Sequence, residues 1–284
     1  MIDAVTLGRI VQIALEEDVG SGDITSELTL DPRSESEGII LAREAGIMAG
    51  MPVVDQVFFQ VDPNVTVEAR MGEGEPFSEG GIVATVAGPT RSILIGERLA
   101  LNFLQRLCGI ATEAGRYVEA VADTGVTILD TRKTTPGLRE LEKYAVRMGG
   151  GANHRMGLWD GILIKENHAQ AAGGIAEALD RVHQGLAEKE SRYLVVAEVG
   201  DEAQAREAVA AGADRLLLDN MEPASMAKVV KWVRDSDRPE VELEASGGMN
   251  LQNVRTVAVT GVDFISVGAL THSVRSIDLS LLLH

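Results

Sequence analysis

Short apolar runs alternate with helical segments in the second half of the chain, and this alternation restricts the fold more than any other feature. The runs have the length of buried parallel strands, and their spacings of roughly 20 to 35 residues fit successive strand–helix units. They are VTILDT (126–131), GILIKEN (161–167), YLVVAEV (193–199), RLLLDN (215–220), VELEAS (241–246) and DFISVG (263–268). The pattern predicts a parallel α/β structure. It favours an α/β barrel over an open α/β sheet, the other arrangement that the runs allow.

The first half of the chain has a different pattern, which predicts a separate unit. A helix is expected over residues 5–17, ending at Gly20, because the apolar residues recur at helical spacing. Its apolar face consists of Leu7, Ile10, Val11, Ala14 and Leu15. Short apolar runs between residues 37 and 87, broken by turn residues, predict a small and mainly antiparallel sheet. Residues 92–123 then predict one long helix that leads into the second half.

Composition excludes several classes of function. The 284 residues carry a formal net charge of −17, which argues against nucleic acid or an anionic membrane surface as a partner. Cys108 is the only cysteine, so no intrachain disulfide can form, and its apolar helical surroundings predict a buried, unreactive thiol. No run approaches the ~18 apolar residues of a membrane span, and the N-terminus lacks the pattern of a signal peptide. We expect a soluble, cytoplasmic protein.

Polar residues end most of the predicted strands. They are Asp130, Lys165, Glu198, Asp219 and Ser246. In barrels and open α/β sheets the ligand binds at the carboxyl ends of the strands, so these endings predict one composite site.

Cationic side chains are concentrated between residues 131 and 168 of this acidic chain. They are Arg132, Lys133, His154, Arg155 and Lys165. Each lies at a strand end or in a loop, and burying them together would be costly without an anionic ligand. Glycines 149–151 are interpreted as a flexible loop that carries the neighbouring cations over that ligand. Lys143, Lys189 and Lys228 lie in charge-rich helical segments and are expected at the surface.

Small residues follow the last two predicted strands and indicate a phosphate site. Residues 246–248 (Ser-Gly-Gly) and 267–269 (Val-Gly-Ala) can present backbone N–H groups to a phosphate, as late barrel loops often do. An ordinary glycine turn is the alternative. His272 could add a donor. Glu198 and Asp219 end neighbouring strands and could hold Mg²⁺ or face the hydroxyls of a ribose, although salt bridges to nearby cations are the simpler alternative.

Several segments resemble the quinolinate phosphoribosyltransferase family, from near the N-terminus to the last predicted helix. The resemblance is carried by DVGSGDITS (18–26), AREAGIMAG (42–50), ERLALNFLQRLCGIAT (97–112), residues 130–168, LLLDNM (216–221), LEASGGMN (243–250) and GVDFISVGALTHS (261–273). It implies a small N-terminal α/β sandwich (1–112), an incomplete TIM-like α/β barrel (113–272) and a C-terminal tail (273–284) that packs back on the first domain. It also implies a homodimer, which a hexamer could extend, with each site completed by the partner's N-terminal domain.

The family reaction joins quinolinate to 5-phosphoribosyl-1-pyrophosphate (PRPP) with Mg²⁺ as cofactor. It gives nicotinate mononucleotide, pyrophosphate and CO₂ in NAD biosynthesis. By similarity, Arg132, His154, Arg155 and Lys165 hold the quinolinate carboxylates, and Arg98 reaches the ligand from the neighbouring subunit. Thr131 belongs to the same binding turn, and Lys133 and His272 contact PRPP. Catalytic roles fall to Lys133, Lys165, Glu198 and Asp219, and the last two also hold the metal. The phosphate cradle would consist of Ser246, Gly247, Gly248, Val267, Gly268 and Ala269.

One position departs from the family pattern. The family usually has Glu-Val-Glu before the acidic strand end, and Val196 occupies the first Glu position here. Because Glu198 keeps the second carboxylate, we expect the site to be retained with a different local charge network. Two rival interpretations are a relative with altered pyridine or base specificity, such as the homologues linked to molybdate transport, and a non-catalytic phosphate-ligand sensor. Retention of the cationic set and of both carboxylates favours the enzyme.

Overall fold

The computed structural model describes residues 2–284, which divide into two compact units. The first unit comprises residues up to 115 together with 134–150 and 270–284, and the second comprises 116–133 and 151–269. The family resemblance implies that residues 134–150 belong to the barrel domain, whereas in the structure they cluster with the N-terminal part of the chain.

A four-stranded antiparallel sheet forms the centre of the first unit, as the sequence predicts. Its strand order is β12-β1-β5-β3. These strands are β1 (Glu35–Ala42), β3 (Thr66–Ala69), β5 (Ile82–Pro89) and β12 (Leu279–Leu283), and a second, two-stranded sheet pairs β2 (Gly46–Ile47) with β4 (Pro76–Phe77). Because β12 comes from the C-terminal tail, the two ends of the chain meet in one sheet.

Helices of the first unit follow local sequence signals. They are α1 (Ala4–Val19), α2 (Ile24–Thr29), α3 (Met51–Val61), α5 (Arg139–Met148), α11 (Ala269–His272, whose first residue belongs to the second unit) and most of α4 (Thr90–Ala120). The carboxylate of Asp3 accepts the Thr6 N–H and caps α1, which ends at Gly20 as expected. The predicted long helix is confirmed as α4. The sequence analysis missed α3, although its buried residues Val54 and Phe58 have helical spacing.

Six parallel strands form the sheet of the second unit, and each coincides with one predicted run. The strands are β6 (Thr127–Leu129), β7 (Ile162–Ile164), β8 (Val195–Val199), β9 (Arg215–Asp219), β10 (Glu242–Ser246) and β11 (Phe264–Ser266). Their order is β6-β11-β10-β9-β8-β7, so the first two strands in sequence lie at the two edges of the sheet. This α/β arrangement agrees with the predicted incomplete barrel.

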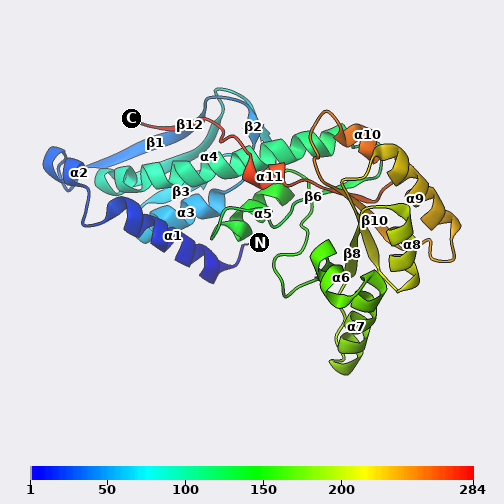
Figure 1. Cartoon of the computed structure of the whole chain (residues 1–284). Helices are drawn as coiled ribbons and strands as arrows, with labels where there is room; N and C mark the ends of the chain where they lie inside the picture. The colour runs from blue at the N-terminus through cyan, green and yellow to red at the C-terminus, as the bar shows by residue number, and fades with distance from the viewer. Residues whose placement is uncertain (1) are drawn as a thin grey trace. The chain divides into compact units, whose positions relative to one another are not determined.

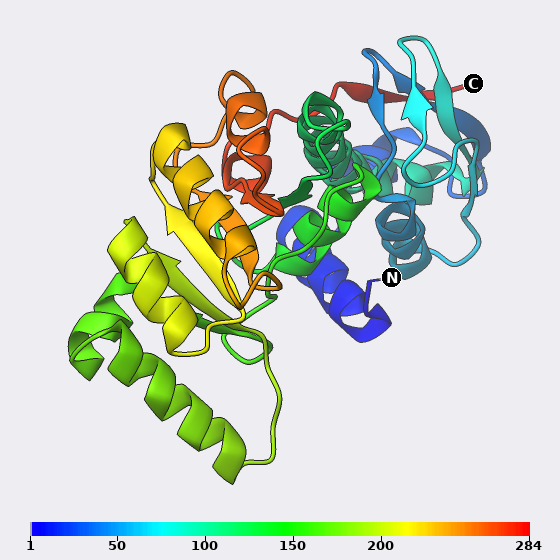
Figure 2. The same cartoon turned by 90° about the vertical axis from the view of Figure 1, so that its right-hand side faces the viewer.

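Helices connect successive strands of this sheet and lie along one side of it (Figures 1 and 2). They are α6 (Glu166–Ala172), α7 (Ile175–Glu188), α8 (Glu202–Ala210), α9 (Pro223–Asp235) and α10 (Val254–Ala258). Neighbours in sequence from α7 to α10 also contact one another. None of the helices within residues 2–284 has the length and apolar character required to cross a bilayer.

Polar and apolar residues alternate along β10, β9 has a charged residue at each end, and the strand register places the polar residues of both strands on one face. Arg215 is registered with Glu242, and Asp219 with Ser246, so these residues share one face with Glu244. Glu198 of β8 joins that face because its register partner is Leu217. Leu216, Leu218 and Leu243 point to the other face and are fully buried. One face of the sheet therefore carries charged residues at two levels, with Leu217 among them.

Candidate active site

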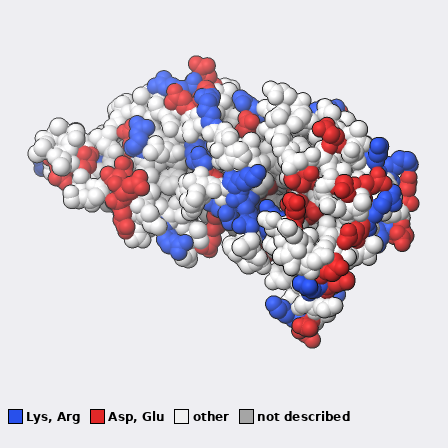
Figure 3. Space-filling model, in the orientation of Figure 1, with Lys and Arg blue, Asp and Glu red and all other residues white. Residues whose placement is uncertain are grey.

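Charged side chains meet at the carboxyl edge of the six-stranded sheet, as the strand endings predict. Lys165 follows β7 and is exposed, while Glu198 and Asp219 come from the neighbouring strands β8 and β9. The two carboxylates line a cavity of about 670 Å³ together with Glu166 and Glu207. Away from this edge, acidic and basic side chains are interspersed over α8 and α9 (Figure 3), as on an ordinary solvated surface.

A buried carboxylate fixes the loop that carries two of the predicted cations. Asp130 follows β6, is completely buried, and accepts hydrogen bonds from Asn153 Nδ2 (2.5 Å) and from the His154 N–H (2.9 Å). A parallel bridge between Leu129 and Ala152 holds the same loop beside β6. The loop therefore lies at the carboxyl end of β6 in one defined conformation.

Two guanidinium groups approach each other in this part of the second unit. Burial lowers the pKa of Arg155, and the positive charge of Arg132 lowers it further, against a smaller opposing effect of Asp160. Arg155 Nη1 donates to the Gly161 carbonyl (2.9 Å), and the Asp160 carboxylate accepts the N–H groups of Met156 and Gly157. Like charges held together by a rigid turn favour an anionic ligand, and arginine forks match carboxylates in particular.

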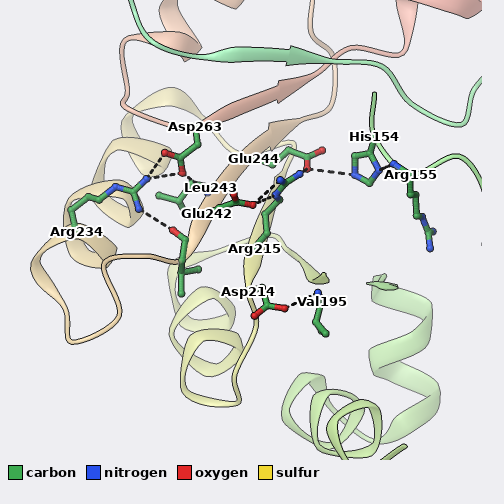
Figure 4. A network of polar contacts seen from close by, with 11 residues as sticks. His154, Arg155, Val195, Asp214, Arg215, Arg234, Glu242, Leu243, Glu244 and Asp263 are labelled. Atoms are coloured by element: carbon green, nitrogen blue, oxygen red, sulfur yellow. Dashed lines mark hydrogen bonds and ion pairs between the residues drawn. The ribbon is translucent and has the colours of Figure 1, made fainter. Parts of the chain in front are cut away.

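His154 is held at both ring nitrogens (Figure 4). Its Nδ1 accepts the N–H of Arg155 (2.8 Å), and its Nε2 lies 3.5 Å from Oε2 of Glu244. Glu244 is fully buried in β10. Burial raises the pKa of the Glu244 carboxyl, but hydrogen bonds with His154 and Ser266 and the positive charges of His154 and Arg215 outweigh burial, so the pKa lies below its ordinary value.

Arg215 occupies the centre of the same network and is fully engaged. It contacts Oε2 of Glu242 through Nε (2.8 Å) and Nη2 (2.6 Å), and Oε2 of Glu244 through Nη1 (3.2 Å). Its guanidinium also lies 4.0 Å from the ring centroid of Phe264. Val196 is its register partner on β8. The carboxylates that neutralise Arg215 thus come from β10, and β8 contributes none at the level of Val196.

The glycine loop after β10 has the backbone conformation that only glycine adopts readily. Gly247 has φ +94°, and a Cβ added there would lie 2.2 Å from Asn220 Oδ1. Gly248 has φ +61°, with open space around it. In the loop after β11, by contrast, the Val267 N–H already donates to the Leu129 carbonyl (2.9 Å). The first loop therefore keeps the features of a phosphate cradle, whereas the Val267 amide is used within the sheet.

The remaining predicted residues are distributed over both units. In the second unit, Thr131 Oγ1 accepts the Lys133 N–H (3.0 Å), and Gly268 and Ala269 follow β11. In the first unit, Arg98 is exposed on α4 and lines a cavity with Asp18 and Asp23, while exposed His272 ends α11.

Three findings differ from the sequence analysis or were missed by it. Lys143, expected at the surface, is fully buried, because α5 buries six consecutive residues around its whole circumference. Gly149 belongs to a close contact and not to a flexible loop, since a Cβ there would lie 2.2 Å from the Ala111 carbonyl oxygen. The Arg215–Glu242–Glu244 network was missed. Its signal is the alternation of charged residues within VELEAS, which a strand buried on both faces would not have.

Glu198 and Asp219 are suited to a Mg²⁺ ion that also binds a substrate. Among residues 2–284, no group of three or more His, Cys, Asp or Glu side chains is arranged to hold a metal ion. Magnesium commonly takes only one or two protein carboxylates and completes its shell with water and substrate phosphates. Two carboxylates lining one cavity fit that mode of binding.

Comparison with known proteins gives matches along most of the chain. Models of the quinolinate phosphoribosyl transferase N-terminal and C-terminal domains match residues 23–108 and 110–282. A probable nicotinate-nucleotide pyrophosphorylase [carboxylating] of Bacillus subtilis is 43% identical over 265 residues, which cover 93% of this chain and 89% of the relative. Quinolinate phosphoribosyltransferase [decarboxylating] 1b of Nicotiana tabacum is 41% identical, and the match covers 97% of this chain and 81% of the tobacco protein.

Solved structures agree with the sequence matches. The nicotinate-nucleotide pyrophosphorylase from Francisella tularensis superposes with a TM-score of 0.94 at 37% identity, covering 100% of this chain and 98% of the other. The similarity therefore extends over both units.

Proposed function

The chain belongs to the quinolinate phosphoribosyl transferase family, and from this we propose that it transfers the phosphoribosyl group of PRPP to quinolinate with loss of CO₂. The products would be nicotinate mononucleotide, pyrophosphate and CO₂, and the reaction would supply NAD biosynthesis. The observation that carries the proposal is the pairing of opposite charges at one sheet edge. Arg132, Arg155 and Lys165 belong to the same unit as the cavity lined by Glu198 and Asp219.

The substrates explain why both signs of charge are needed. Quinolinate is a dicarboxylate, which the guanidinium groups of Arg132 and Arg155 and the ammonium of Lys165 would bind and orient. PRPP is an anion at its phosphates, but its ribose carbon becomes positive as pyrophosphate leaves. Glu198 and Asp219 would stabilise that charge, and the loop at Gly247 and Gly248 would bind the 5-phosphate.

The reaction needs no protein nucleophile. The pyridine nitrogen attacks the ribose carbon as the bond to pyrophosphate breaks, and the resulting cationic ring accepts the electron pair left by the departing carboxylate. The side chains bind, orient and balance charge. Lys133 would neutralise the pyrophosphate. A Mg²⁺ ion held by Glu198 and Asp219 would supply further positive charge to that leaving group.

The proposal includes a homodimer in which Arg98 completes the partner's site. Its support is the exposure of Arg98 on α4 of the first unit. Mixing subunits tests this arrangement. Arg98→Ala and Lys165→Ala dimers should each be inactive, whereas mixed dimers should recover activity, because one of their two sites is then intact. Absence of recovery in verified mixed dimers would contradict the shared site.

A direct assay tests the proposed reaction. Purified protein is incubated with quinolinate, PRPP and Mg²⁺, and nicotinate mononucleotide and CO₂ are followed, with nicotinate as a parallel substrate. We expect product from quinolinate alone. Turnover of nicotinate instead would show that the cations do not select a second carboxylate. Failure with both substrates would favour a relative of altered specificity or a binding protein.

A further inference from the structure

One arginine of α4 joins three segments of the first unit. The guanidinium of Arg106 contacts Oε1 of Glu142 in α5 through Nε (2.9 Å) and Nη2 (2.6 Å). Its Nη2 also donates to Oγ1 of Thr135 (2.8 Å) and to the Thr271 carbonyl in α11 (3.1 Å). Both α5 and α11 accordingly lie beside α4 (Figure 1). No substrate contact is assigned to any of these four residues, so the proposed reaction does not account for the bridge that they form.

The bridge is largely shielded from water. Glu142 has no exposed side-chain surface, Thr271 is fully buried, and 28% of the Arg106 side chain is exposed. A buried carboxylate is costly without a partner, and the carbonyls in the last turn of a helix have no partner within that helix. Arg106 donates to both kinds of acceptor. A lysine would present a single ammonium, whereas the planar fork of arginine reaches several acceptors at once.

Glu142 extends the bridge to the turn that follows Lys133. Its Oε2 accepts the Thr135 N–H (3.0 Å), while its Oε1 accepts from Arg106. The turn is closed by a hydrogen bond from the Leu138 N–H to the Thr135 carbonyl (3.0 Å). Thr135 is therefore held at its N–H and at its hydroxyl, two residues after the lysine that would neutralise pyrophosphate.

The same helix, α4, also holds the tail that follows α11. The Ile277 N–H donates to the Gln105 carbonyl (3.0 Å). A Cβ on Gly109 would lie 2.3 Å from the Arg275 carbonyl oxygen, so the tail passes directly over the helix. His272, the predicted PRPP contact of α11, therefore lies between two places where the chain is attached to α4.

We propose that Arg106 is a positioning residue for PRPP, which holds the turn after Lys133 against the helix that carries His272. PRPP has phosphoryl groups at both ends, so two contacts bind it together only when their spacing is fixed. The cations that the same subunit would offer to quinolinate belong to the second unit and are outside the bridge. The inference rests on the proposed function, because it takes PRPP to be a substrate.

Three variants separate positioning from folding. Arg106→Lys keeps the charge beside the buried carboxylate of α5 and loses the fork that reaches the other two segments. Arg106→Met combined with Glu142→Leu removes the whole bridge and leaves no buried charge unpaired, so this double variant should fold. Arg91→Lys is the matched control, because Arg91 lies on the same helix and donates to the carbonyls of Glu27 and Leu30 at the end of α2.

Steady-state kinetics and calorimetric titration with PRPP and Mg²⁺ measure the effect. We expect Arg106→Lys to raise the KM and the Kd for PRPP about tenfold, with kcat and the KM for quinolinate within about threefold, because the contacts to PRPP are displaced and not removed. The double variant should raise the KM for PRPP further, and Arg91→Lys should match the wild type. Backbone hydrogens of residues 131–138 and 269–276 should exchange faster in Arg106→Lys than in Arg91→Lys.

Three results would overturn the proposal. They are an unchanged KM and Kd for PRPP in the double variant, equal effects of Arg106→Lys on the KM of both substrates, and equal hydrogen exchange in Arg106→Lys and Arg91→Lys. If the double variant does not fold, Arg106→Lys decides. Hydrogen exchange requires no substrate and the titration requires no turnover. Failure of the proposed reaction is therefore recognised in the wild type, and failure of the positioning role in the variants.

Discussion

The charged face of the six-stranded sheet has two levels with opposite properties. At the inner level, Arg215, Glu242 and Glu244 contact one another, and every charge has a partner within the protein. At the carboxyl edge, Glu198 and Asp219 line a cavity and Lys165 is exposed. Both levels are built from alternate residues of neighbouring strands. Charges on one surface therefore serve structure where they are paired internally and are available to a ligand where they are not.

The largest effect is expected at the edge, from Lys165→Ala. Lys165 is exposed, so its loss should leave the thermal unfolding midpoint within about 1 °C, while kcat/KM for quinolinate falls about 10³-fold because a charge acting on the substrate is removed. Steady-state kinetics and calorimetry measure both. Lys189→Ala, at another exposed lysine, is the control. An unchanged kcat/KM in Lys165→Ala would remove the distinction between the levels.

Asp219→Asn should lower kcat by about 10² and raise the Mg²⁺ concentration needed for half-maximal activity, because the amide neither balances a positive ribose carbon nor attracts the metal. Titration of activity against Mg²⁺ measures both effects. A lowered kcat with unchanged Mg²⁺ dependence would separate the ribose role of Asp219 from its metal role.

Gly247→Ala tests the phosphate loop, whose proposed contacts come from the backbone and not from charged side chains. We expect a loss of about 2 to 3 kcal/mol in the free energy of unfolding, since φ is +94° and the new Cβ would meet Asn220. Gly248→Ala, in open space at φ +61°, should lose only about 1 kcal/mol. Urea denaturation gives both values, and equal losses would contradict the close contact with Asn220.

Lowering the pH should reduce the stability of the inner level by protonating Glu244. Its pKa lies below the ordinary 4.5, so the charge contributes stability above pH 4.5 that is lost as the pH falls through the lower folded-state pKa. Wild type should exceed Glu244→Gln by about 2 kcal/mol in unfolding free energy near neutral pH. This difference should narrow below pH 4.5. A difference that widened in acid would reverse the assigned direction.

The smallest effect is expected at Cys108, which lies in neither level. Burial raises the pKa of this thiol to about 12, so thiolate is scarce at neutral pH. The native protein should therefore react with a thiol reagent only after denaturation, and the Cys108→Ser variant should keep full activity. Rapid labelling of the native protein would contradict the observed burial.

The sequence predicted the edge level better than the inner level. Strand endings are visible as charged residues after apolar runs, so Glu198 and Asp219 could be placed at the ends of neighbouring strands from the sequence alone. Arg215 begins its run and Glu244 lies inside one, and their pairing depends on the register between β9 and β10, which a single sequence does not contain.

The sequence analysis missed two elements, α3 and β12, for a similar reason. The segment Met51–Val61 lies between strands and is apolar on much of its circumference, so its helical period was hidden. β12 pairs with β1 across nearly the whole chain, and such a distant pairing leaves no local signal. Burial of Lys143 likewise depends on the packing of α5 and not on its charge-rich sequence.

A crystal structure with quinolinate bound would test the two-level account most directly. The account predicts that the carboxylates of the ligand contact Arg155 and Lys165, while Arg215 keeps its contacts with Glu242 and Glu244. A ligand carboxylate bound to Arg215, with Glu242 or Glu244 displaced, would contradict it.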